Sequence, residues 1–330
     1  MTERTTFNTY EKNGLKFIGI ENDTVRTVFI PEIGGKMVEL THKKTGNQFL
    51  LKPAAGVTYK KAEYGANFEK YDLSGFDECF PTVSEAVLDN GGQELTFPDH
   101  GELWSQPWEY EIEGSRLLLS VDGLNLNCRL VKRIKLLNDG LMIDYFLENL
   151  SDESFDYLWS AHPLLKATPG SEVILDKEID QVLVNWASDD SIGVLGDTVS
   201  WPVVQKNGES LDFSKVHDKK AGTTAKFFTG KLTSGVAGFY REDIDETLMY
   251  RFDPQKVPYL GLWLCYGGWP DWTDDKHLTV ALEPTNGRPD SLKEAVKRDE
   301  CASLGPNQST CWSLELSFIK GKGDPRKEIR

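Results

Sequence analysis

The chain has 330 residues, of which 39% are hydrophobic and 27% are charged, a composition typical of globular rather than disordered proteins. Its formal net charge of −15 argues against nucleic acid as a partner, because polyphosphate binding needs clustered Lys and Arg. The same charge argues against an anionic membrane surface.

Short β-branched and apolar runs follow one another along the chain, separated by Gly, Asn, Asp and Pro. They predict strands at residues 24–30, 36–40, 48–51, 117–121, 128–136, 141–147, 173–175, 237–240, 247–252, 260–266, 278–283 and 311–319. Residues 290–298 read as a helix, with Asp and Ser near its start and basic residues near its end. This order predicts an all-β sandwich or barrel. No repeat or linker-like tract interrupts it, so we expect a single domain over residues 1–330.

The segment from about residue 56 to 107 is rich in loops, aromatic residues and polar residues. A loop insert on a rigid β scaffold is a common place for a functional site, although large β proteins also carry long loops without one.

The five cysteines form no CxxC pair or other metal-binding spacing, and most lie in apolar stretches. This pattern indicates free thiols in a reducing compartment. The N-terminal residues lack the apolar segment of a signal peptide, and no window has the roughly 18 apolar residues of a membrane helix. We therefore expect a cytoplasmic protein.

Two of the five histidines lie where chemistry is plausible. His42, His217 and His277 read as solvated residues of turns and loops. His100, in FPDHGELWSQPW, lies among aromatic and polar residues, the combination that sugar sites use. His162, in YLWSAHPLL, ends an apolar segment and is a candidate acid or base. Either could alone be a structural histidine.

A carboxylate ends a late apolar strand. Glu283, in TVALEPTNGRP, would have its pKa raised by burial toward the range useful for proton transfer, although strand-end Glu residues are often exposed. Arg288 could pair with Glu283 or clamp a substrate.

Motifs for other chemistries are absent from the sequence. It has no P-loop, GxGxxG, GxSxG or HExxH motif, so we expect no nucleotide cofactor and no metal. The adjacent pair Asp77 and Glu78 could suggest a glycosidase, but neighbours on a strand point to opposite faces.

The order HGELW, WSAHP and LEPTNG, preceded by IPEIGGKMVEL at residues 30–40, resembles the galactose mutarotase-like family, the aldose 1-epimerases. The resemblance runs from about residue 15 to 320. It implies a large antiparallel β-sandwich of the supersandwich type. It also implies that His162 is the catalytic acid at the ring oxygen, that Glu283 is the base at the anomeric hydroxyl, and that His100 helps to hold the sugar.

The sequence departs from the family pattern upstream of His100, where an Arg that contacts the sugar is missing. Asn67, Asp77 and Glu78 are the polar candidates there. Asp253 is the best match for the family's sugar-binding aspartate, and Trp263 could provide a stacking wall.

We therefore expect an isomerase that interconverts the anomers of a free aldose, as a monomer or homodimer. A non-catalytic sugar-binding or sensing protein on the same fold is an alternative, as is a hexose-6-phosphate 1-epimerase. The phosphate would need a cluster of Arg and Lys, and only Arg251 and Arg288 are candidates. We find no residue signature for a lyase or glycosidase.

Overall fold

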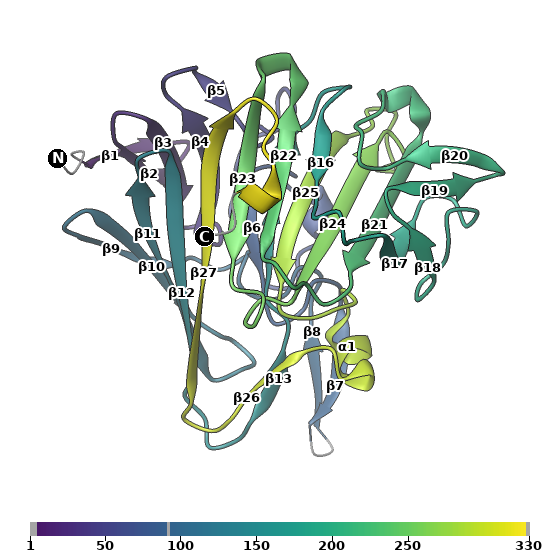
Figure 1. Cartoon of the computed structure of the whole chain (residues 1–330). Helices are drawn as coiled ribbons and strands as arrows, with labels where there is room; N and C mark the ends of the chain where they lie inside the picture. Colours follow the sequence, from purple (N-terminus) through teal and green to yellow (C-terminus); the bar gives the residue numbers. More distant parts are fainter. Residues whose placement is uncertain (1–4, 91–92, 328–330) are drawn as a thin grey trace.

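A computed structural model describes residues 5–90 and 93–327 of the chain. Within these residues, nearly all regular structure is strand, and neighbouring strands pair antiparallel in two large sheets that face each other (Figure 1). This confirms the predicted all-β sandwich. No helix in the described ranges is long and apolar enough to cross a membrane.

The larger sheet has 13 strands among the described residues. In spatial order they are β1 (Thr6–Lys12), β2 (Leu15–Glu21), β3 (Val25–Ile30), β4 (Lys36–His42), β6 (Phe76–Cys79), β14 (Ser160–Pro163), β25 (Leu278–Thr285), β24 (Tyr259–Tyr266), β21 (Thr223–Thr229), β17 (Gln181–Ala187) and β18 (Thr198–Ser200). Two short strands lie off this path: β5 (Asn47–Gln48) pairs with β4, and β15 (Leu165–Lys166) pairs with β25.

The second sheet has eight strands in the described part of the chain. Their order is β16 (Glu172–Ile174), β22 (Val236–Arg241), β23 (Glu246–Phe252), β27 (Ser309–Lys320), β12 (Gly140–Asn149), β11 (Cys128–Leu137), β10 (Arg116–Asp122) and β9 (Glu109–Glu113). Buried and exposed residues alternate along β11 and β27, so this sheet has one face on the core and one toward solvent.

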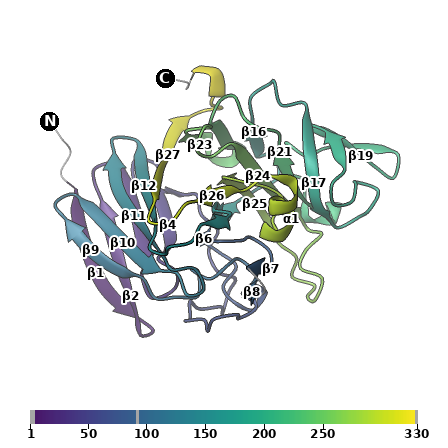
Figure 2. The ribbon, with the colours of Figure 1, turned by 90° about the horizontal axis from the view of Figure 1, so that it is seen from below.

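Short elements complete the described structure. They are the strand pairs β7 (Ala86–Asn90) with β8 (Gln93–Phe97), β13 (Phe155–Tyr157) with β26 (Ala302–Leu304), and β19 (Val203–Lys206) with β20 (Glu209–Asp212), the helix α1 (Leu292–Arg298), and the single-turn helices η1 (Phe68–Lys70), η2 (Lys219–Ala221), η3 (Glu242–Ile244) and η4 (Pro325–Lys327). Seen from below, α1, β7 and β8 lie together beside the central strands of the larger sheet (Figure 2).

The central strands of the larger sheet are buried on both faces. Every residue of β14 and β21 is buried, as is every residue of β25 after Leu278. One face packs on the second sheet through a single apolar cluster that contains residues from Ile18 to Phe318. The other face must therefore be covered by connecting segments, and this cover creates the cavity described below.

The predicted loop-rich segment supplies part of that cover. It is seated on the Gly34-Gly35 turn, where Gly34 N donates to Gln106 O (2.8 Å) and Trp108 N donates to Pro31 O (2.9 Å). Gly34 has φ +75°, and a Cβ at this position would lie 2.5 Å from Trp104 O. The close approach therefore requires glycine here.

Candidate active site

A cavity of about 450 Å³ lies on the loop-covered face of the larger sheet. Strand residues form its floor, and residues of η1 and of the connecting segments form its walls. The lining residues on the strands are His162, Asn185, Trp186, Lys226, Trp263, Thr279 and Glu283, and those outside them are Phe68, Glu69, Leu73, Val83, Ser84, Asp99, His100, Leu164, Trp269, Asp271, His277 and Asp290.

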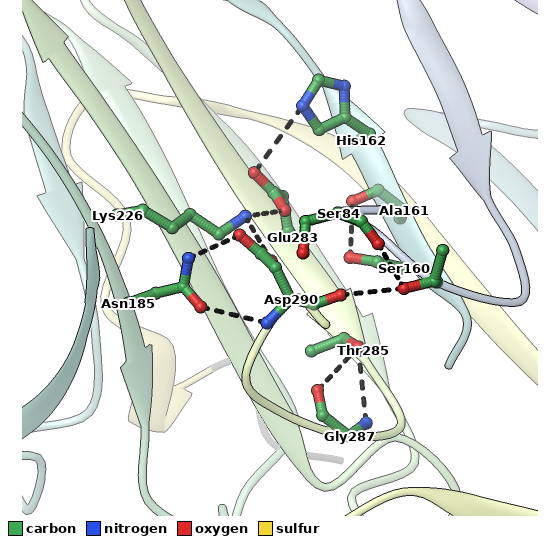
Figure 3. A network of polar contacts seen from close by, with 11 residues as sticks. Ser84, Ser160, Ala161, His162, Asn185, Lys226, Glu283, Thr285, Gly287 and Asp290 are labelled. Atoms are coloured by element: carbon green, nitrogen blue, oxygen red, sulfur yellow. Dashed lines mark hydrogen bonds and ion pairs between the residues drawn. The ribbon is translucent and has the colours of Figure 1, made fainter. Parts of the chain in front are cut away.

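His162 and Glu283 are cross-strand neighbours on the cavity floor. The strand β14 pairs with β25 at Ser160 and Thr285, and this register sets His162 opposite Glu283. Paired residues of antiparallel strands point to the same face of a sheet. His162 Nε2 lies 3.9 Å from Glu283 Oε1, and both side chains are buried (Figure 3).

Glu283 also pairs with a buried lysine. Lys226, on β21, forms an ion pair with Glu283 Oε2, and its Nζ lies 3.5 Å from Asp290 Oδ1. Burial raises the pKa of Glu283, and the ammonium of Lys226 only partly opposes this rise. Burial would lower the pKa of Lys226, but the Asp290 and Glu283 carboxylates reverse that effect and raise it.

Asp290 is held by hydrogen bonds from two segments. Asn185 Nδ2 donates to Asp290 Oδ2 (2.8 Å), and Asp290 N donates back to Asn185 Oδ1 (3.0 Å) (Figure 3). Its carbonyl oxygen accepts from Val83 N and Ser84 N, both at 3.0 Å. The helix begins at Leu292, with Ser291 as its N-cap residue, so Asp290 belongs to the cavity wall rather than to the predicted helix.

His100 carries a carboxylate partner above the floor. Its Nδ1 lies 2.9 Å from Asp99 Oδ2, and its ring stacks on Phe68 with 3.8 Å between centroids. The ring centroids of His100 and His162 are 4.9 Å apart. His100 has φ +61°, a left-handed conformation that histidine tolerates better than bulkier residues.

The two histidines have pKa shifts of opposite sign. Burial lowers the pKa of His100, but the adjacent Asp99 carboxylate outweighs it and the net shift is upward. Burial lowers the pKa of His162 well below its usual value, and the charge on His100 lowers it further. These shifts favour a proton on His100 over a proton on His162.

Asp77 lies beside His162 in the larger sheet but outside the cavity lining. It is the residue opposite His162 on β6, and Lys36 Nζ lies 3.1 Å from its Oδ2 and 2.6 Å from Asp72 Oδ2. Burial raises the pKa of Asp77 to about 6, with Lys36 opposing the rise. Asp77 is not among the described residues that line the cavity.

The structure places Glu78 on the opposite face, away from the predicted sugar site. Its Oε1 accepts from Lys132 Nζ (3.2 Å) and Tyr145 OH (3.0 Å), both on the second sheet, and its Oε2 accepts from Trp159 Nε1 (3.0 Å). The alternation of side chains along β6 is the reason, because Asp77 takes the position that faces the cavity side. Glu78 connects the two sheets instead.

Three further predicted residues lie outside the cavity lining. Asn67 caps η1 by accepting a hydrogen bond from Glu69 N (2.8 Å). Asp253 is exposed in the turn after β23, where it accepts from Gln255 N (2.9 Å). Arg288 does not reach Glu283; its guanidinium pairs with Glu300 (2.8 Å) and donates to Thr229 O (2.7 Å). Turns that Asn67 and Asp253 stabilise explain the first two placements, and the ion pair with Glu300 explains that of Arg288.

Several cavity residues were not predicted from the sequence. Asn185, Trp186 and Lys226 lie on β17 and β21, two strands that the apolar pattern did not reveal. A lysine inside the run TTAKFFT was the available signal, since a charge within a buried strand needs a partner. His277 was expected at the surface, but it lines the cavity, with its ring 5.1 Å from that of Trp269.

Two other histidines are also less solvated than predicted. His42 Nδ1 lies 3.0 Å from the buried Glu246 carboxylate, and its ring stacks on Phe318. His217 Nε2 lies 2.8 Å from Asp212 O. Neither lines the cavity.

Comparison of the sequence with protein families finds a match to the N-terminal part of the chain. Residues 2–114 match a family described as a domain of unknown function, DUF5107. No curated protein matches the chain.

Comparison with solved structures is more informative. A galactose mutarotase-like protein from Lactobacillus casei has a TM-score of 0.67 at 12% identity, over 92% of this chain and 100% of that one. A galactose mutarotase-like protein from Clostridium acetobutylicum has a TM-score of 0.65 at 16% identity, over 96% and 99%. A galactose mutarotase related enzyme from Lactobacillus acidophilus has a TM-score of 0.63 at 11% identity, over 97% and 99%. At these identities the likeness is one of fold, and the chain has the galactose mutarotase-like fold, a large antiparallel β-sandwich.

Proposed function

We propose that this protein is an aldose 1-epimerase that interconverts the α and β anomers of an uncharged aldose. The observation that carries the proposal is the His162–Glu283 pair, an imidazole nitrogen and a carboxylate oxygen 3.9 Å apart on the floor of one cavity. The two oxygens on an anomeric carbon are neighbours, so an acid and a base that act on them must also be neighbours.

The reaction needs a base that takes a proton from the anomeric hydroxyl and an acid that gives a proton to the ring oxygen. Glu283 removes the proton from the anomeric hydroxyl, the C1–O bond of the ring breaks, and the ring oxygen receives a proton from the histidine side. The product is the open-chain aldehyde. At this point Glu283 has gained one proton, and the pair formed by His162 and His100 has lost one. Rotation about C1–C2 and reclosure by the reverse steps yield the other anomer and restore both groups.

The histidine pair supplies the proton in this scheme. His100 is the group whose pKa is raised, and its ring lies 4.9 Å from that of His162. His162 faces Glu283 and is the donor to the sugar, while the raised pKa of His100 favours a proton on the pair. Trp263, diagonal to Glu283 in the pairing of β24 with β25, would border the sugar on the β24 side as an apolar wall.

The charge of the cavity favours a neutral sugar over a sugar phosphate. Five carboxylates line it among the described residues, against one ammonium. That ammonium, Lys226, is already paired with Glu283 and Asp290. A phosphate would therefore meet net repulsion from the lining carboxylates. A purely sugar-binding role is the remaining alternative, but it gives no reason for a buried base beside a buried imidazole.

The proposal is tested by polarimetry of freshly dissolved α-glucose, α-galactose and less common aldoses, with and without the protein. We expect at least one aldose to reach anomeric equilibrium faster with protein than in buffer, and His162→Asn to reduce the excess rate about 100-fold or more. Binding of a sugar without any faster equilibration would support the non-catalytic role and overturn the proposal.

A further inference from the structure

Three tryptophans lie together in the lining of the cavity. We call Trp186, Trp263 and Trp269 the tryptophan cluster. The rings of Trp186 and Trp263 stack with 5.8 Å between centroids, and Trp269 meets Trp263 edge-on at 5.6 Å. Trp186 remains 37% exposed, unusual for so large an apolar side chain that belongs to a cavity lining.

The sheet register fixes where the cluster lies relative to the acid–base pair. Lys226 on β21 pairs with Trp186 on the neighbouring strand β17 and with Trp263 on the other neighbour, β24. Trp263 in turn pairs with Ala281 on β25. Glu283 is two residues further along β25, on the same face and about 7 Å away along the strand. The cluster is therefore about one sugar ring from the proposed reaction centre.

The cavity has more volume than one sugar needs. A hexose has 12 non-hydrogen atoms and fills roughly 200 Å³ at the packing density of a protein interior. The cavity holds about 450 Å³. One ring beside Glu283 would leave space of similar size next to the tryptophan cluster.

Two further carboxylates line the same cavity and are available to a second ring. Asp271, from the segment after β24, and Glu69, from η1, both line the cavity. Carboxylates accept hydrogen bonds from hydroxyl groups, and flat indole surfaces pack against the C–H faces of sugar rings. The combination suits a second sugar better than a purely apolar group.

We propose that the substrate is a reducing disaccharide or longer oligosaccharide, whose reducing-end ring lies between His162 and Glu283 and whose next ring packs on the tryptophan cluster. This inference rests on the proposed function. Since anomer interconversion needs a free anomeric hydroxyl, the second ring is attached through another hydroxyl of the reducing-end sugar.

Binding and catalysis are measured separately for two monosaccharides, glucose and galactose, and for disaccharides. Each disaccharide has glucose or galactose at its reducing end, joined to the second ring by a 1→3, 1→4 or 1→6 bond. Calorimetric titration gives affinities, and exchange NMR gives kcat/KM. We expect at least one disaccharide to bind about three- to tenfold more tightly than its monosaccharide, as expected for one added aromatic contact. Trp186→Ala should remove this preference and leave monosaccharide affinity within twofold.

Two further variants provide the comparison. Trp186→Phe should keep most of the preference, because it retains an aromatic surface. Trp272→Ala removes a tryptophan that is 53% exposed and lies outside the cavity lining, and should change nothing.

Equal affinity for every disaccharide and its monosaccharide would overturn the inference, as would an equal loss of both in Trp186→Ala. Disaccharide preference in binding without faster anomer exchange of any sugar would instead refute the proposed function and leave the second-ring site standing.

Discussion

Glu283, His162 and His100 share one cavity, but their pKa values are shifted by different neighbours. Burial raises the pKa of Glu283 and lowers that of His162, so both groups favour their neutral forms. The Asp99 carboxylate reverses the effect of burial on His100. The proposed reaction needs Glu283 ionised and one proton on the histidine pair, which confines activity to a window of pH between these transitions.

Asp99→Asn should narrow that window from its alkaline side. Loss of the carboxylate lowers the pKa of His100, so the histidine pair loses its proton at lower pH. The alkaline limb of the kcat/KM profile should therefore move to lower pH, while the acid limb, set by Glu283, stays in place. An unchanged alkaline limb in pH-rate measurements would show that His100 does not hold the catalytic proton.

Lys226→Met should act on Glu283 and on stability together. Without the ammonium, burial of Glu283 is unopposed, its pKa rises further, and the acid limb of the kcat/KM profile should move to higher pH. Removing one partner of a buried ion pair costs about 3–5 kcal/mol of unfolding free energy. Because the raised pKa keeps Glu283 protonated in acid, the loss should be smallest at low pH and grow as the pH rises through that pKa.

A double-mutant cycle distinguishes this coupling from general damage. Lys226→Met combined with Glu283→Gln should cost less than the sum of the single changes in urea unfolding, because the double variant has no unpaired carboxylate at position 283. Additive losses would mean that the ion pair does not stabilise the native state as described.

The sequence predicted individual residues where their surroundings carried a clear signal. His162 and Glu283 each end an apolar run, and His100 lies among aromatic residues, so each was a candidate. Lys226 and Asp290 were missed because their partners come from distant strands and turns. Asp290 reads as a helix cap in the sequence, and only its hydrogen bonds with Asn185 reveal its other role.

At the scale of elements, the segment that carries His100 depends on the Gly34-Gly35 turn. Gly34 N donates a hydrogen bond to Gln106 O. The Trp104 carbonyl approaches Gly34 so closely that a Cβ at Gly34 would lie 2.5 Å from the carbonyl oxygen. His100 is four residues before Trp104, so a shift of this segment moves His100.

Gly34→Ala should therefore lower both stability and activity. The positive φ and the clash together should cost about 2–3 kcal/mol in urea unfolding, and displacement of His100 should reduce kcat/KM about tenfold or more. Gly46→Ala is the matched control, with the same φ of +75° but no atom within 4 Å of the added Cβ. It should cost about 1 kcal/mol and leave kcat/KM unchanged. Equal effects of Gly34→Ala and Gly46→Ala on stability and on kcat/KM would contradict the proposed dependence of this segment on the Gly34-Gly35 turn.

Strand prediction worked where the apolar pattern is unbroken, both in half-solvated strands such as β11 and in the buried strands β24 and β25. Strands β17 and β21 were missed because each carries polar residues into the cavity, and these residues break the apolar pattern. The predicted strand at 48–51 is reduced to Asn47–Gln48 in the structure.

At the scale of the whole molecule, the two sheets share one core. Glu78 on β6 accepts hydrogen bonds from Lys132 on β11 and Tyr145 on β12. The match to DUF5107 ends at residue 114, inside the hairpin in which Glu113 pairs with Arg116. That boundary cuts a strand pair, so it is not a natural domain boundary, and we propose that residues 1–330 form one domain.

A single domain should unfold in one cooperative transition. Tryptophan fluorescence and far-UV circular dichroism should give the same urea midpoint, because both sheets contribute to one large apolar cluster. Two separated transitions, or a stable fragment that ends near residue 114 in limited proteolysis, would contradict the single domain.

The overall topology was beyond prediction from the sequence patterns alone. Strands β6, β14 and β25 are neighbours in the larger sheet although about 80 to 120 residues separate them along the chain. Composition and periodicity indicate how many strands to expect but not this order. Only the resemblance of three short motifs implied that His162 and Glu283 would meet.

The most direct test of the central claim is exchange NMR of the α and β anomers with wild-type protein and with Glu283→Gln, a change that keeps the size of the side chain but removes the base. We expect wild type to accelerate exchange of at least one reducing sugar and Glu283→Gln to lower the acceleration about 100- to 10,000-fold, with the fold and sugar binding retained. Exchange at the same enhanced rate in the variant, or at the buffer rate in wild type, would contradict it.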